Sequence, residues 1–412
     1  MDGALLIFLL VYIAMAVGTL PGFKVDRTGA ALVGALALLA TGEMTSEQAW
    51  AAIDYRTIGM LFGLMLVSGA FVVSGFYATV AARVAQLDVS PPVLLAVLVA
   101  VGGALSAVLT NDVVVVAMTP LLIAATMARG LNPVPFLLGF CFATNIGSVA
   151  TVIGSPQNMV IAQSLGLGFV DFMAKTTVPV LLSLPVAWVI VAALYRGRWA
   201  LPPGQRPAAP AAGAAPPFLM LETIKASIVT LTVVAAFVAT DWPRDQIALA
   251  AGAVLLVNRR IASGDVLRQV DGDLLILIMG LFVVNAAMAA TGLPQHILGE
   301  ARALGINLQE PMPLFWVGAV LSDIVGNNPA VMLLMPFVSA APDATALGAA
   351  LALGTGFSSN LFVFGSLAGI IVVEQAAAHG VRISFRDFAR AGVPVSLATM
   401  LVGQIWVLLV LA

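Results

Sequence analysis

The sequence predicts an all-α polytopic membrane protein built from two similar halves. Its 412 residues are 61% hydrophobic and only 9% charged, whereas a soluble domain carries about 25% charged residues. Apolar runs of about 17–25 residues recur along the chain, as helices that cross a bilayer core of about 30 Å require. Polar interruptions of this apolar pattern occur at matching places in the two halves, which indicates an internal repeat.

The repeat is clearest around two asparagines. Asn111 is followed by Pro120, and Asn327 is followed by Pro336 at the same spacing. Both pairs of equivalent residues lie 216 positions apart (327 − 111 and 336 − 120). Broken, polar stretches in corresponding places of two hydrophobic halves are the best sequence indication of the binding site of a secondary transporter.

Each half is expected to contain five spans, and one of these is broken by polar residues. A re-entrant hairpin accompanies them. The first half, 1–195, has expected spans at 3–20, 28–42, 55–75, 134–162 (broken) and 176–195, with its hairpin near 92–128. The second half, 222–412, has expected spans at 223–240, 246–258, 271–291, 346–378 (broken) and 391–411, with its hairpin near 312–341. Because five is odd, about ten transmembrane helices would form two inverted repeats.

The segment between the halves and the basic residues set the expected orientation. The Pro- and Ala-rich segment 196–221 is expected to be an extended cytoplasmic linker. The predicted spans place all eighteen Lys and Arg residues on one side except Arg56, Lys175, Arg244 and Arg302. By the positive-inside rule the richer side is cytoplasmic. We therefore expect both termini outside, in a bacterial cytoplasmic (inner) membrane, with the first span retained because it lacks the features of a signal peptide.

The two hairpin tips and the two breaks form the candidate site. Irregular backbone at membrane depth is tolerated only where it is buried in protein or lines a watery cavity. Glycine allows close backbone approach, half-helix ends add partial charges, and Asn and Ser supply neutral donors and acceptors. The candidate residues for binding a substrate or ion are Thr110, Asn111, Asp112, Asn145, Gly147, Ser148, Gly154, Ser155, Asn158, Asp323, Asn327, Asn328, Thr355, Ser358, Ser359, Asn360, Gly365 and Ser366.

The acidic residues define what the site can carry. A carboxylate at membrane depth is costly and indicates a functional site or a proton relay, so Asp112 is the candidate for proton coupling. Asp323 lies about one helical turn before Asn327 and is either a second site residue or a residue near the aqueous mouth. Asp54 and Asp271 begin matching spans and are expected at the membrane interface. The four interruptions contain no basic residue, which favours a neutral or weakly charged solute coupled to H⁺ or Na⁺ without excluding an anion held by helix dipoles.

Structural roles are the alternative for these residues. An Asn or Asp at a tip can cap the following helix, and a Ser in a broken span can allow close helix packing. Capping alone does not explain why both tips carry the same residues. Cys141 is the only cysteine, and with only His296 and His379 beside it neither a disulfide nor a soft-metal site is expected. We expect no cofactor.

Two motifs resemble the ion transporter superfamily in its arsenite-permease (ArsB-type) and citrate-transporter-like branch. They are Thr110-Asn111-Asp112 with Thr119-Pro120, and the run from Asn145-Ile146-Gly147-Ser148 to Gly154-Ser155-Pro156-Gln157-Asn158. The resemblance covers nearly the whole chain outside the linker. It implies a transport domain of hairpins and broken helices that moves by an elevator mechanism. It also implies one site at Asn111, Asp112 and Gly154, and its symmetry mate at Asn327, Asn328 and Gly365.

The tips decide between branches of this superfamily. They read Thr-Asn-Asp and Gly-Asn-Asn, whereas dicarboxylate symporters typically show Ser-Asn-Thr, so the sequence favours arsenite or antimonite efflux in exchange for protons. The alternatives are a sodium- or proton-coupled transporter of small anions (carboxylate or sulfate), a sodium/proton antiporter, and a channel. A homodimer and a soluble ATPase partner are compatible with the resemblance, and no nucleic-acid partner is expected. An enzyme is disfavoured, because no Gly-x-Gly-Asp or His-Glu-x-x-His motif is present.

Overall fold

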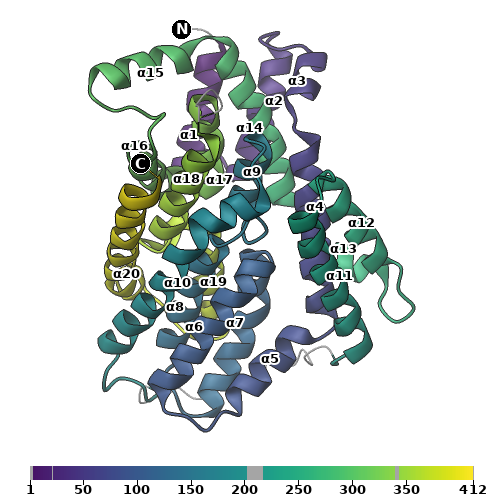
Figure 1. The fold of residues 1–412 in the computed structure, drawn as a ribbon, viewed down its shortest axis with the longest axis vertical. Coiled ribbons are helices and arrows are strands. Elements are labelled where there is room, and N and C mark those ends of the chain that lie inside the picture. The colour runs from purple at the N-terminus through teal and green to yellow at the C-terminus, as the bar shows by residue number, and fades with distance from the viewer. Residues whose placement is uncertain (1–2, 21, 202–216, 339–342, 412) are drawn as a thin grey trace.

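The computed structural model describes residues 3–20, 22–201, 217–338 and 343–411, and these residues form helices without any strand (Figure 1). Seven of the described helices are long and apolar enough to cross a membrane: Tyr55–Val73, Pro91–Val108, Asn111–Ala128, Phe169–Leu194, Met220–Ala239, Gly272–Ala290 and Phe385–Leu411. Six more apolar helices have 10–17 residues. The prediction of an all-α polytopic protein is confirmed, whereas most of the expected linker, at 202–216, lies outside the described residues.

The helices follow one another in the same order in the two halves. The first half contains α1 (Gly3–Val17), α2 (Arg27–Ala40), α3 (Ser46–Ala52), α4 (Tyr55–Val73), α5 (Phe76–Ala85), α6 (Pro91–Val108), α7 (Asn111–Ala128), α8 (Pro133–Ser148), α9 (Pro156–Ser164) and α10 (Phe169–Leu194). The second half contains α11 (Met220–Ala239), α12 (Arg244–Leu256), α13 (Ser263–Leu267), α14 (Gly272–Ala290), α15 (Leu293–Ala303), α16 (Pro311–Val325), α17 (Asn327–Val338), α18 (Ala344–Ser358), η1 (Val363–Gly365), α19 (Leu367–Ala378), α20 (Phe385–Trp406) and η2 (Val407–Leu411).

The sequence analysis missed the helices α5 and α15. Each begins after a glycine in the left-handed region, Gly75 with φ of 75° and Gly292 with φ of 76°. Only glycine adopts this conformation at little cost, so the chain can turn sharply at the end of α4 and of α14. Both helices fall between an expected span and its hairpin, where no element was expected.

Two helix pairs repeat the same close contact. A Cβ on Gly63 of α4 would lie 2.4 Å from the carbonyl carbon of Ala248 of α12. A Cβ on Gly280 of α14 would lie 2.8 Å from the carbonyl carbon of Ala31 of α2. Gly280 lies 217 residues after Gly63, and Ala248 lies 217 residues after Ala31 (280 − 63 and 248 − 31). The pairs α4/α12 and α2/α14 are therefore equivalent, and each is packed backbone to backbone.

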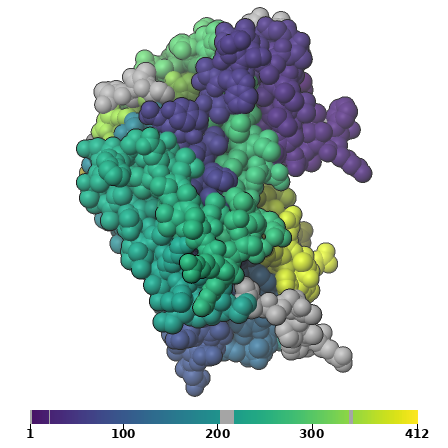
Figure 2. All heavy atoms as spheres, turned by 90° about the vertical axis from the view of Figure 1, so that its right-hand side faces the viewer, coloured from purple at the N-terminus to yellow at the C-terminus, as the bar shows by residue number. Residues whose placement is uncertain are grey.

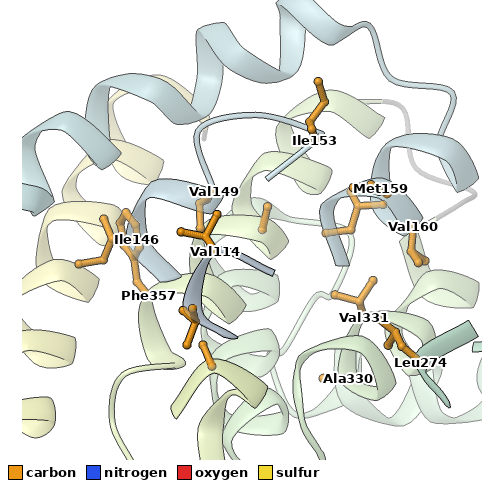
Figure 3. Packing of buried hydrophobic residues seen from close by; sticks show 14 of the residues in the cluster. Val114, Ile146, Val149, Ile153, Met159, Val160, Leu274, Ala330, Val331 and Phe357 are labelled. Atoms are coloured by element: carbon orange, nitrogen blue, oxygen red, sulfur yellow. The ribbon is translucent and has the colours of Figure 1, made fainter. Parts of the chain in front are cut away.

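The hairpins and broken helices pack across the two halves. Helix α7 of the first hairpin packs against α19, and α17 of the second hairpin packs against α9. Figure 3 shows this shared core, in which Met159 and Val160 of α9 lie beside Ala330 and Val331 of α17. Each half therefore completes the core of the other.

The pairs α2/α14 and α4/α12 lie beside this central core. In Figure 1 the purple α1 and α2 lie with α14 in the upper part, and α4, α11, α12 and α13 lie along the right-hand side. Figure 2 shows that side, where the residues of α11 to α13 cover the surface below the N-terminal helices. Long apolar side chains are exposed on α11, including Ile228 at 59% and Leu231 at 67%, as expected for a lipid-facing helix.

The contact at Gly63 gives a test of this packing. Gly63→Ala should destabilise the protein by about 1–3 kcal/mol, because the new methyl group would meet backbone that cannot rotate away. The melting temperature of the detergent-purified protein should fall. Gly299→Ala is the matched control, since a Cβ at that helical glycine would meet nothing within 4 Å. An unchanged melting temperature in Gly63→Ala would contradict the close packing of α4 on α12.

Candidate functional site

The two hairpin tips meet at one cavity of about 280 Å³. Its lining includes residues of both tips, both breaks, and the first turns of α2 and α14. The polar and charged lining residues are Arg27, Thr28, Asn111, Asp112, Gln157, Asp271, Asp273, Asn327, Asn328 and Ser366. A cavity at the meeting point of discontinuous helices is the usual place for the substrate of a secondary transporter.

The first tip is fixed to the first break by its backbone. The backbone N–H of Asn111 donates to the carbonyl oxygen of Gly154 at 3.0 Å. A Cβ on Gly154 would lie 2.2 Å from the carbonyl oxygen of Ser148 and 2.6 Å from that of Ser106. Gly154 therefore allows the break to lie directly on the hairpin, and Thr151 strengthens the contact by donating from Oγ1 to the carbonyl oxygen of Ala107 at 2.6 Å.

The second tip is fixed to the second break by side chains. Nδ2 of Asn327 donates to Oγ of Ser359 at 2.9 Å, and Oγ of Ser322 donates to Oδ1 of Asn327. Gly326, which separates α16 from α17, has φ of 93°. Asp323 turns toward the break, because a Cβ on Gly365 would lie 2.6 Å from its Oδ1.

Asn145 joins the two halves at the centre of the site. Its Nδ2 donates to Oδ1 of Asn360 and to Oγ of Ser366, both at 2.9 Å. Its Oδ1 accepts from Nδ2 of Asn111 at 3.4 Å. Close by, a Cβ on Gly356 would lie 2.1 Å from Cγ2 of Val149, so α18 and the end of α8 cross without space for a larger side chain. Tips and breaks therefore form one bonded unit.

The predicted site residues fall into two groups. Five of them line the cavity directly: Asn111, Asp112, Asn327, Asn328 and Ser366. Behind them lie residues that bond to one another, to other side chains or to the backbone, namely Thr110, Asn145, Ser148, Asn158, Thr355, Ser358, Ser359 and Asn360. Gly147 is a packing residue, since a Cβ there would lie 2.4 Å from Cα of Gly103.

Several buried oxygens near the tips and breaks have no hydrogen-bond partner among the described residues. They are Asn111 Oδ1, Ser155 Oγ, Asn158 Oδ1, Asp323 Oδ1 and Asn328 Oδ1. Buried polar atoms are nearly always paired, so these oxygens are free to accept a proton donor or to coordinate a hard cation. No group of three His, Cys, Asp or Glu residues that could hold a metal ion occurs in the described part of the chain.

The sequence analysis missed Arg27 and did not count Asp271 among the site residues. The four interruptions do lack basic residues, but Arg27 reaches the cavity from the first turn of α2, with Nη1 3.7 Å from the Cβ position of Gly326. Asp271, expected at the membrane interface, lines the same cavity together with Asp273. The short predicted span 28–42 could have indicated that Arg27 lies inside the protein. Its fifteen residues do not reach across a bilayer core that needs about 20.

Comparison with known proteins agrees with this architecture. The apolar helices and the cavity between broken segments are features of a multi-pass membrane transporter. A family model described as "Citrate transporter" matches residues 10–356. The chain therefore belongs to the citrate transporter family, within the divalent anion/sodium symporter-like superfamily.

Individual relatives are transporters or membrane proteins. The chain is 28% identical to the "46 kDa membrane protein" of Mycobacterium leprae over 98% of this chain and 97% of that protein. It is 29% identical to the "Silicon efflux transporter LSI3" of Oryza sativa subsp. japonica over 43% of this chain and 36% of that protein. The structure of the efflux pump MtrF of Neisseria gonorrhoeae superposes with a TM-score of 0.64 at 12% identity, covering 99% of this chain and 94% of that one.

The bridge at Asn145 can be tested by truncation. Asn145→Ala removes the two 2.9 Å bonds between the halves and leaves Asn360 Oδ1 without that donor. A buried polar group that loses its partner costs about 1–3 kcal/mol, so the melting temperature and any transport should both fall. Asn307→Ala is the control, because Asn307 bonds to Glu310 at the protein surface. Equal melting temperatures for the two variants would contradict a bridging role.

Proposed function

We propose that this protein is a secondary transporter that moves a small carboxylate anion together with a cation. The observation that carries the proposal is Arg27, whose guanidinium lines the cavity between the two tips. Arginine is suited to holding a carboxylate through two parallel hydrogen bonds. The family description points to citrate as the first anion to test.

The charges around the cavity favour coupling to a cation. One guanidinium residue, Arg27, and three carboxyl residues, Asp112, Asp271 and Asp273, line the same cavity. An anion placed among ionised carboxylates would be repelled. Protons or sodium ions bound at the carboxyl groups and at the unpaired oxygens would remove that repulsion, so binding of the anion would depend on binding of the cation.

The movement proposed for this transporter is that of an elevator. The tips and breaks are joined by Asn145 into one unit, and the pairs α2/α14 and α4/α12 lie beside it. We expect this unit to slide as a body against the flanking helices, in a chain of two inverted five-span repeats. The homodimer and the orientation with both termini outside stay predictions.

Arsenite or antimonite efflux by proton antiport is the second candidate. The uncharged Asn, Gln, Ser and Thr side chains of the cavity favour it, because arsenite at neutral pH is mostly an uncharged trihydroxide. The rice relative, named for efflux of silicon, adds to this support. Arg27 gives no advantage to an uncharged solute, and for this reason we rank the carboxylate first.

Replacing Arg27 tests the anion contact. In proteoliposomes, Arg27→Ala should raise KM for citrate about 10- to 100-fold, because a hydrogen bond to a charged group contributes about 1.5–3 kcal/mol. Arg27→Lys should recover part of the loss, since it restores the charge but not the paired geometry. Arg268→Ala, which removes an exposed arginine paired with Asp265, should behave as wild type. Wild-type KM in Arg27→Ala would contradict the proposal, and arsenite flux with no carboxylate flux would favour the second candidate.

Replacing Asp112 tests the coupling. Asp112→Asn keeps the size and hydrogen-bonding capacity of the side chain but cannot bind or release a proton. If Asp112 carries the coupling proton, this variant should bind citrate yet fail to accumulate it against a gradient. Uptake should be compared with an imposed pH gradient and with an imposed Na⁺ gradient at fixed pH. Accumulation driven equally well by a pH gradient in the variant would remove Asp112 from the coupling mechanism.

A further inference from the structure

Arg27 has a counterpart in the second half of the chain. Arg244 is the first residue of α12, as Arg27 is the first residue of α2. The two arginines are 217 residues apart (244 − 27), the same spacing that relates Gly63 to Gly280 and Ala31 to Ala248. They therefore occupy equivalent positions in the equivalent helix pairs α2/α14 and α4/α12.

The surroundings of the two arginines differ. Arg27 donates from Nε to the carbonyl oxygen of Met15 at 2.9 Å, lies beside the second tip and lines the cavity of the site. Arg244 donates to the carbonyl oxygen of Leu167, just beyond α9, and lines a separate pocket of about 370 Å³. Equivalent residues of a repeat thus hold different positions relative to the tips.

Helix packing shows the same asymmetry. Helix α4 packs against α9 and α1 packs against α16. The equivalent pairs, α14 with α19 and α11 with α6, do not pack to a similar extent within the residues that the structure describes. The unit of tips and breaks is bonded across both halves through Asn145, so the asymmetry lies in how this unit sits on the flanking helices.

Exchanging the roles of the halves gives a second arrangement of the same kind. At present the pair α2/α14 contacts the second tip near Arg27. In the second arrangement the pair α4/α12 would make the equivalent contacts with the first tip near Arg244. The first tip now contacts α4 at Ser68, whose Oγ accepts from Oγ1 of Thr110 at 2.8 Å. The exchange would break this bond and move the first tip along α4 toward the start of α12. Bistable packing of this kind is a common basis of conformational switching, and inverted repeats supply it in transporters.

We propose that Arg244 is a second anion-binding residue, which replaces Arg27 at the carboxylate when the unit of tips and breaks takes this second arrangement. Arg244 would then lie beside Thr110 of the first tip, as Arg27 now lies beside Gly326. The inference rests on the proposed carboxylate transport. It means that a guanidinium contacts the anion in both arrangements, that of Arg27 in the present one and that of Arg244 in the second.

Kinetics measured separately from the two faces of the membrane test this assignment. In oriented proteoliposomes, Arg27→Ala should raise KM for citrate at least 10-fold from one face, and Arg244→Ala should do so from the opposite face. Arg244→Lys should recover part of the loss on that same face, and Arg268→Ala should leave both KM values at wild type. If Arg244 serves only to bond Leu167, its replacement will lower the melting temperature but leave KM unchanged from both faces, which would overturn the proposal.

Cross-linking tests the second arrangement without measuring transport. In a Cys141→Ser background, cysteines replace Thr110 and Pro243, the residue before Arg244. A bismaleimide should join them in the membrane and lock the protein, whereas the single-cysteine variants should not react in this way. Failure to cross-link in a protein that still transports citrate would overturn the inference and leave the proposed function intact. If the cysteines cross-link but the wild-type protein moves no carboxylate, the proposed function is overturned. The role of Arg244 as an anion contact is then overturned as well.

Discussion

The structure depends on one constraint: backbone that is broken at membrane depth must find its hydrogen-bond partners inside the protein. Lipid supplies none, and each unpaired group would cost several kcal/mol. The first tip meets this requirement by donating from the backbone N–H of Asn111 to the carbonyl oxygen of Gly154. At the second tip the backbone N–H of Gly326 donates to the carbonyl oxygen of Ser322, and the Asn327 and Ser359 side chains join the tip to the break. Asn145 then connects the two breaks. These bonds place both tips at one cavity and give the site its shape.

The composition of that cavity sets what the protein can carry. Amides and hydroxyls alone would suit an uncharged solute, and carboxyl groups alone would suit a cation. The combination of Arg27 with Asp112, Asp271 and Asp273 suits an anion and a cation bound together. In the proposed function, coupling follows from electrostatics, because the anion would be repelled by the carboxyl groups until a cation is bound there.

Much of this could be predicted from the sequence. The charge content and the apolar runs gave the all-α membrane class, and the spacing of Asn111 and Asn327 identified both tips. Asn145 and Asn360 were predicted as site residues, but not that they bond to each other, because no local pattern encodes a contact between residues 215 positions apart in the chain. Arg27 was missed for a related reason. It lies at a helix start outside the four interruptions, and its place at the cavity depends on how α2 packs against α14.

The most direct measurement is a structure of the protein determined by electron cryomicroscopy in the presence of citrate. The account predicts density for the anion between the two tips, with its carboxylate oxygens within hydrogen-bond distance, about 2.7–2.9 Å, of the Arg27 or the Arg244 guanidinium. Citrate density at a site away from both arginines and both tips would contradict it. So would an empty cavity at a citrate concentration that saturates transport.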